Sequence, residues 1–311
     1  MFNCKLSPEK FVSVVEHISE GHSPTSITRT CHVHHDTVER IARVTAEHAQ
    51  AIHDAHVQNL QITGLQADER HGFAGTKNNP FWEATTLDPE SKFVIGLQLG
   101  PRTEALIKTL LTDTMNRLLF PQNLVLFSDG LPSYSSLFPE VFGLAFRPSK
   151  STNKGRRKSV QYKIPHSLAH VQVIKNREGH KLKTVEVRVA HGSQKRVNLE
   201  LTRLGYSIAN TSAIERQNGT ARQSTMFMGR KGLSFAHLER SRVAAAEVAR
   251  LSYNWVRAHS SLRVRLEKAV GRQKWVQRTP AMAVGISDRV WAWLDVLGSP
   301  VWALGMRNHS T

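Results

Sequence analysis

The sequence predicts an α/β protein in which a mixed sheet with flanking helices follows an all-helical N-terminal segment. Apolar residues recur with helical spacing up to about residue 60, and from Gly64 onward short strand-like segments take over. Three strands, a helix and then a buried strand form an order typical of α/β sheets. A chain of 311 residues is long enough for two or three compact units with a sizeable core.

The composition favours a nucleic-acid partner. Lys and Arg number 42 and Asp and Glu 25, which gives a formal charge of +17. So large a positive excess favours a polyanion, most commonly DNA or RNA. The sequence has no apolar run long enough to span a bilayer and no segment typical of a signal peptide, so we expect no membrane partner. Only two cysteines are present, which favours the reducing cytoplasm.

Residues 1–60 contain three segments with helical spacing of their apolar residues. Ser7 precedes a proline at the start of the first segment and Asp36 precedes the third, so both are expected N-caps. A long helix, a short helix, a tight turn and a third helix form the order of a helix-turn-helix domain. This order places Arg40 and Arg43 on the helix expected to contact DNA. The alternative is a small helical cap with no particular function.

The stretch CHVHH contains side chains that can bind zinc, among them Cys31, His34 and His35. A tetrahedral zinc site needs four ligands at suitable spacing. The sequence has no C-x2-C pair, and Cys4 is far away along the chain. We therefore predict a polar turn between the second and third helices and leave metal binding at these residues open.

Residues 61–260 are predicted to form the main α/β domain. The segments GLQADERHGF, WEATTLD and KFVIGLQLG have the pattern of three successive strands. TEALIKTLLTDTMNRLL is an amphipathic helix, and NLVLFSDG is a continuous apolar run typical of a strand buried on both faces. In the later segment FAHLERSRVAAAEVARLSYNWV, apolar side chains at helical spacing indicate core packing.

Residues 150–205 are predicted to be a basic loop followed by an inserted β-hairpin. Residues 150–163 hold six basic side chains and no acidic one. They can contact phosphates, although a solvated charged loop is the alternative; the expected contacts are Lys154, Arg156, Arg157 and Lys158. The sequence VQVIKNREGHKLKTVEVRV then has the pattern of a strand, a turn and a second strand. For residues 261–311 we expect a basic C-terminal tail with one short helix near Asp288.

Three acidic residues are candidates for a shared metal site. Asp68 and Asp129 each come near the end of a predicted strand, and Glu215 lies in the first turns of a predicted helix. Carboxylates that converge from neighbouring strands supply the oxygen ligands that Mg²⁺ prefers. Taken singly, each has an ordinary structural explanation: Asp68 as a turn cap, Asp129 as a turn former, and Glu215 as half of an ion pair with Arg216 or Arg222.

The stretches LQADERHGF, LFSDGLPSY, NTSAIERQNGTARQ and YNWVRAHSSL resemble the motifs of DDE transposases of the insertion-sequence-one type. The resemblance implies an RNase H-like catalytic domain in which Asp68, Asp129 and Glu215 bind two Mg²⁺ ions, for which Mn²⁺ can substitute. It also implies that Arg222, seven residues after Glu215, contacts DNA near the scissile bond. Arg216 is a further expected DNA contact.

The expected function is that of a transposase of an insertion sequence. Such an enzyme binds the ends of the element, cleaves DNA and transfers the freed strand to a target. We expect double-stranded DNA as the partner, a homodimer or larger assembly on that DNA, and a nucleoid-associated location in a prokaryotic cytoplasm. Two alternatives are a domesticated regulator that binds DNA without cutting it and a structure-selective nuclease of the same fold, which cuts without joining.

Overall fold

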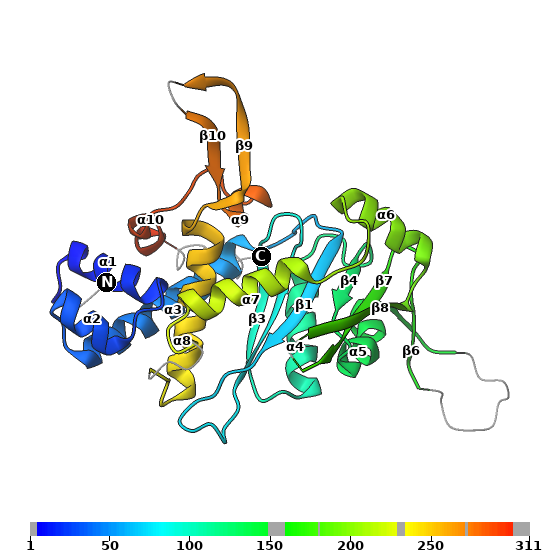
Figure 1. Cartoon of the computed structure of the whole chain (residues 1–311), viewed down its shortest axis with the longest axis horizontal. Helices are drawn as coiled ribbons and strands as arrows, with labels where there is room; N and C mark the ends of the chain where they lie inside the picture. The colour runs from blue at the N-terminus through cyan, green and yellow to red at the C-terminus, as the bar shows by residue number, and fades with distance from the viewer. Residues whose placement is uncertain (1–4, 149–158, 180, 229–233, 271–272, 301–311) are drawn as a thin grey trace, which may run out of the picture.

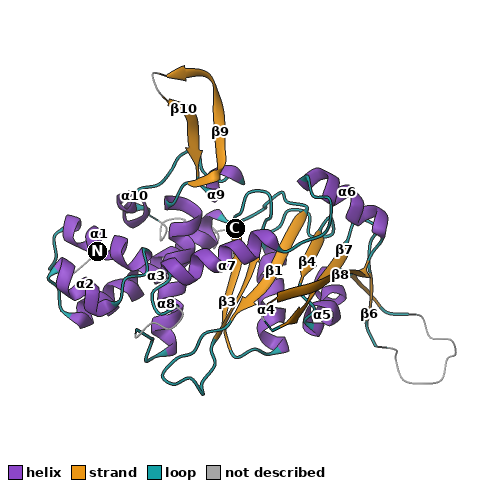
Figure 2. Ribbon diagram, viewed as in Figure 1, coloured by secondary structure: helices purple, strands orange, loops and turns teal. Residues whose placement is uncertain are grey.

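The computed structural model describes residues 5–148, 159–179, 181–228, 234–270 and 273–300 (Figure 1). A helical region and a sheet region lie at opposite ends of the molecule, and a long helix, α8, lies between them (Figures 1 and 2). No helix among these residues is both long enough and apolar enough to cross a membrane.

The N-terminal helices are α1 (Pro8–Ser19), α2 (Pro24–Cys31) and α3 (His35–His56). The Ser7 hydroxyl accepts a hydrogen bond from the Lys10 backbone N–H at 3.3 Å, which confirms Ser7 as the cap of α1. The predicted cap of α3 is wrong. His34 is the capping residue, because its Nδ1 accepts from the Asp36 backbone N–H at 3.3 Å, and Asp36 lies in the first turn instead. An aspartate there still favours the helix through the positive N-terminal end of its dipole.

The main sheet has six strands in the order β3-β2-β1-β4-β7-β8. β1 pairs with β2 and β2 with β3 in antiparallel fashion, whereas β4 is parallel to both β1 and β7. The strands are β1 (Gly64–Arg70), β2 (Trp82–Leu87), β3 (Val94–Gly100), β4 (Val125–Ser128), β7 (Ala169–Glu178) and β8 (Lys181–His191). The predicted mixed sheet is therefore confirmed.

The predicted hairpin exists, but it is not an insertion. β7 pairs with β4 inside the main sheet, and β8 adds the edge strand antiparallel to β7. A separate small sheet joins β5 (Leu144–Phe146) to β6 (Gln161–Lys163). Sequence pattern alone cannot distinguish the two arrangements, because strand order depends on contacts between segments far apart in the chain.

Helices cover both faces of this sheet. Leu126 of β4 packs in one apolar cluster with Phe138 of α5, whereas its neighbour Phe127 packs in another with Val197 of α6. Alternate residues of a strand point to opposite faces, so α5 and α6 lie on opposite sides. The helices are α4 (Glu104–Asn116) and α5 (Pro132–Phe142) on one side, and α6 (Gln194–Leu204) and α7 (Ser212–Ser224) on the other.

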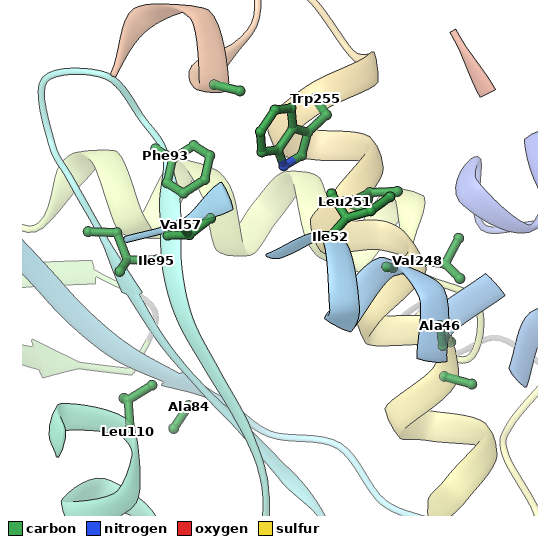
Figure 3. Close-up of a cluster of buried hydrophobic side chains, with 14 of the residues drawn as sticks. Ala46, Ile52, Val57, Ala84, Phe93, Ile95, Leu110, Val248, Leu251 and Trp255 are labelled. Carbon is green, nitrogen blue, oxygen red and sulfur yellow. The ribbon is translucent and has the colours of Figure 1, made fainter. Parts of the chain in front are cut away.

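The helix α8 (Glu239–Leu251), continued by a π-helical turn at Ser252–Val256, joins the two regions. It packs against α3, and Figure 3 shows Ile52 of α3 beside Leu251 of α8. Trp255 and Phe93 of the β3 side extend the same buried cluster. The predicted core role of this segment is confirmed, and the N-terminal helices share one continuous core with the sheet.

The turn after α1 also touches the main domain. Gly21 has a φ of +78°, and a Cβ atom there would lie 2.7 Å from the carbonyl oxygen of Gln223 in α7. Only glycine adopts this conformation at such close approach without strain. The helical region is therefore fixed against the C-terminal end of α7 as well as against α8.

The C-terminal region differs from the predicted tail with one short helix. A two-stranded ribbon, β9 (His259–Val270) and β10 (Gln273–Arg278), projects from the body (Figure 1). Two short helices follow it, α9 (Pro280–Ala283) and α10 (Trp293–Gly298), and the second begins five residues beyond Asp288. The alternation of apolar and basic residues in SLRVRLE is the period-two signal that marks the ribbon.

Candidate functional site: an acidic cleft beside helix α7

Strand β1 is held tightly against α7 by side chains that alternate along it. The Gln66 side chain accepts a hydrogen bond from the Ile214 backbone N–H and donates one to the Asn210 carbonyl, each at 2.9 Å. Two residues later, the Asp68 carboxylate accepts a bond from the Asn218 amide at 2.6 Å. Gln66 and Asp68, which lie on the same side of β1, therefore fix the position of α7 and place the Asp68 carboxylate beside this helix.

Asp129 lies beside Asp68 because β1 and β4 are parallel neighbours. Their register pairs Ala67 with Ser128, and the next residue on each strand path is an aspartate. Burial and the nearby Asp129 charge together raise the pKa of Asp68 to about 7. The two carboxylates therefore repel one another, and a bound cation would reduce that repulsion.

Glu215 lies in the first turn of α7, where the sequence placed it. Its carboxylate accepts hydrogen bonds from the ammonium group of Lys175 and the hydroxyl of Thr211. Although burial acts to raise the pKa of Glu215, these bonds hold it below its usual value. Lys175 comes from β7, so three neighbouring strands and α7 all contribute to this region.

The three predicted acids line one open cleft of about 550 Å³. Its other side chains are Val173, Ile174, Lys175, Arg177, Thr211, Asn218 and Arg222. Arg222 thus lies at the same cleft as Glu215, as expected for residues two turns apart on one helix face. The cleft combines acidic groups that can hold cations with basic groups that can hold phosphates.

The acids are not grouped as a finished metal centre. Across the described ranges, no three His, Cys, Asp or Glu side chains lie in a cluster able to hold a metal ion. The Glu215 carboxylate is instead engaged by Lys175 and Thr211, and the Asp68 carboxylate accepts a hydrogen bond from Asn218.

Arg216, predicted as a DNA contact, lies at a different cleft. This second cleft, of about 490 Å³, lies between α7 and the root of the β9–β10 ribbon. Lys92, Arg257 and His259 also line it. Consecutive residues on a helix point about 100° apart, so Glu215 and Arg216 line different clefts on two sides of α7.

Arg40 and Arg43, which were predicted as DNA contacts, are exposed on α3. They line a third cleft of about 340 Å³ together with Phe227 and Arg240 of the α8 side. The four basic loop residues Lys154, Arg156, Arg157 and Lys158 lie outside the described residues.

Sequence reasoning missed a buried network that supports the acids. The Arg70 guanidinium donates to the Asn218 side-chain oxygen at 2.8 Å, which turns the Asn218 amide N–H groups toward Asp68. Arg70 also pairs with Glu83 at 2.7 Å, and Arg242 lies 2.7 Å from the other oxygen of Glu83. The basic residue two positions after Asp68 and the asparagine three positions after Glu215 were the available signals.

The CHVHH stretch forms the predicted turn. Cys31 ends α2 and is buried, His32 has a left-handed φ of 51°, and His34 caps α3. The Cys31 sulfur lies 3.7 Å from both the Ser13 hydroxyl and His17 Nδ1. His34 and His35 are exposed. These contacts describe a packed helix end joined to a polar turn.

Comparison with protein-family models and with curated proteins finds no match to this chain.

Proposed function

We propose that this protein is a DDE-type DNA transposase that cleaves DNA at the ends of an insertion sequence and joins the freed strand to a target. The observation that carries the proposal is the acidic cleft. Acids from β1, from the residue after β4 and from α7 line it together, and Lys175, Arg177 and Arg222 stand beside them. That combination suits a phosphodiester held next to divalent cations.

The assignment of the main domain as RNase H-like is part of the proposal. The mixed six-stranded sheet with helices on both faces supports it, as does the cleft that Asp68, Asp129 and Glu215 line together beside the central strands β1 and β4. The assignment of α1–α3 as a helix-turn-helix domain is supported by the helix order and by exposed Arg40 and Arg43 on α3.

The donor set fits Mg²⁺ in its chemistry. Asp68, Asp129 and Glu215 are hard oxygen ligands, and burial together with the Asp129 charge raises the pKa of Asp68, a shift that a bound cation would oppose. These three side chains would hold two ions, with Mn²⁺ as a substitute, and Glu215 joins them by giving up its contact with Lys175. When bound, the ions supply an activated oxygen nucleophile and stabilise the leaving oxygen.

The chain's own residues hold the substrate. Arg222 presents a guanidinium that can bind two oxygens of one phosphate, and Lys175 and Arg177 add positive charge along β7. Hydrolysis of a phosphodiester frees a 3′-hydroxyl, which then attacks a phosphodiester of the target and displaces its 3′ oxygen. No covalent bond to the enzyme forms in either step. Because two element ends are joined in one event, we expect a homodimer or larger assembly on DNA.

The test uses the full chain, Mg²⁺ and duplexes that carry the inverted repeats flanking its coding region. We expect strand cleavage and joining by the wild type. Asp129→Asn is expected to bind the duplex with nearly unchanged affinity and to lose cleavage, since binding rests on the basic surface. Mg²⁺ is expected to raise the melting temperature of the wild type more than that of Asp129→Asn, because a ligand that binds only the folded state stabilises it.

The alternatives give different results in the same assay. Cleavage without joining would favour a structure-selective nuclease. Binding without cleavage, together with equal Mg²⁺ effects on both proteins, would favour a regulator and contradict the proposed chemistry.

A further inference from the structure

The β9–β10 ribbon is exposed on both of its faces where its side chains are described. Arg263, Val264 and Arg265 of β9 and Trp275 and Val276 of β10 are all exposed. An isolated two-stranded ribbon is marginally stable in water. A ribbon exposed on both faces would be stabilised by a partner that covers one of them.

One face of the ribbon is basic and aromatic. The register pairs Trp275 with Arg265, so these two side chains lie on the same face, and Arg263 lies two residues along the strand from Arg265. The Arg263 guanidinium lies over the Trp275 ring at 4.4 Å from its centroid. Stacking of this kind orders the guanidinium while its N–H donors stay available to an anion.

The root of the ribbon continues into the basic cleft beside α7. Arg216 of α7 and Arg257 just before β9 line that cleft with Lys92, and its lining contains no acidic side chain among the described residues. The cleft and the acidic cleft lie on different sides of α7, since Glu215 and Arg216 are consecutive. Positive charge therefore extends from α7 out along the ribbon.

We propose that the basic cleft and the Arg263–Arg265–Trp275 face of the ribbon form a second DNA-binding surface, which holds the phosphate backbone of duplex DNA outside the acidic cleft. The identity of the partner as DNA rests on the proposed function. Charge supports it independently: residues 259–278 contain six Lys or Arg and one Glu. A two-stranded ribbon also has the width that a major groove admits.

The experiment measures the affinity of the full chain for a duplex over a range of salt concentrations. We compare the wild type with Arg263→Ala/Arg265→Ala and with Arg216→Ala/Arg257→Ala. The control is Lys181→Ala/Lys195→Ala, which removes the same charge from exposed positions on β8 and α6. Each test pair is expected to weaken binding and to reduce the slope of log affinity against log salt by about 2, because each phosphate contact contributes about 0.9. The control pair is expected to keep the wild-type slope.

Two further variants and readouts separate the explanations. Arg263→Lys/Arg265→Lys keeps the charge and is expected to restore most of the slope. Unchanged affinity and slope in both alanine pairs would overturn the inference. Loss of self-association by sedimentation, with unchanged affinity per protomer, would also overturn it and assign the ribbon to contacts between copies of the chain.

The inference and the proposed function fail separately. If the ribbon variants bind DNA normally while Asp129→Asn abolishes cleavage, the second surface is wrong and the transposase stands. If the ribbon variants lose affinity but the wild type never cleaves, the surface stands and the chemistry is wrong.

Discussion

At the scale of single residues, Lys175 forms the ion pair that keeps Glu215 from acting as a metal ligand. Its ammonium group binds the Glu215 carboxylate, whereas Asp68 and Asp129 repel one another through their charges. Removing the ammonium should free Glu215 to join the aspartates and should remove a positive charge from the cleft. We therefore expect Lys175→Met to bind Mn²⁺ several-fold more tightly than the wild type in a calorimetric or paramagnetic titration without DNA.

The matched control for this change is Lys181→Met, an exposed lysine on the neighbouring strand β8. Its Mn²⁺ affinity should equal that of the wild type. Weaker Mn²⁺ binding by Lys175→Met would show that Lys175 supports the site rather than competes for Glu215.

At the scale of elements, most helices and strands could be predicted because the spacing of apolar residues that indicates each one lies within that element. The helices α1, α2, α3 and α4 and the strands β1 to β4 each carry a cap, an alternation or an apolar run that lies within the element itself. The three acids were found for the same reason, because each stands next to such a signal. Local pattern also predicted that Glu215 and Arg222 share one face of α7.

What the sequence could not provide depends on distant segments. The place of β7 beside β4 and the contact between Lys175 and Glu215 arise only when the sheet assembles. The buried pairing of Glu83 with Arg70 and Arg242 likewise joins β1, β2 and α8. The ribbon has a local signal, the short alternation of apolar and basic residues, but the basic composition of residues 261–311 favoured the prediction of a tail.

Helix α8 supplies an element-scale prediction, because it packs on α3 and on the sheet side at once. Leu251 is almost fully buried in the core they share (Figure 3). Leu251→Ala should lower the free energy of unfolding by roughly 2–5 kcal/mol, from lost burial and the cavity left behind. Val243→Ala, on an exposed position of the same helix, should change it by less than about 1 kcal/mol.

Urea unfolding followed by circular dichroism measures both changes. Equal losses in the two variants would show that α8 does not carry a core common to the helical region and the sheet.

At the scale of the whole molecule, buried neutral histidines should make the fold sensitive to acid. Burial, with smaller contributions from the charges of His191 and Arg188, lowers the pKa of His170 from 6.5 to about 3. Burial likewise lowers the pKa of His53, whose Nε2 lies 2.8 Å from the Ile95 carbonyl. Both rings are neutral in the folded protein at neutral pH.

The direction of this pH effect follows from which state of the protein binds the proton. Above pH 6.5 both states hold a neutral His170 and its contribution to stability is complete, and as the pH falls from 6.5 toward 3 only the unfolded chain binds the proton. At pH 5 we expect His170 alone to lower the free energy of unfolding by about 2 kcal/mol relative to pH 7.5.

Denaturant unfolding at the two pH values checks this expectation. His170→Gln should show a smaller difference between pH 7.5 and pH 5 than the wild type, whereas exposed His166→Gln should show the same difference. An unchanged difference in His170→Gln would contradict the assignment of acid sensitivity to this ring.

The close packing of Gly21 against the end of α7 would fix the spacing between two sites on bound DNA. Together with the shared α3–α8 core, it holds α3 at a constant separation from the helix that carries Glu215. If the protein cuts DNA as proposed, the number of base pairs between the sequence touched by α3 and the phosphate that is cut is then set by the protein. The length of its terminal repeat would then depend on the packing between the N-terminal helices and α7.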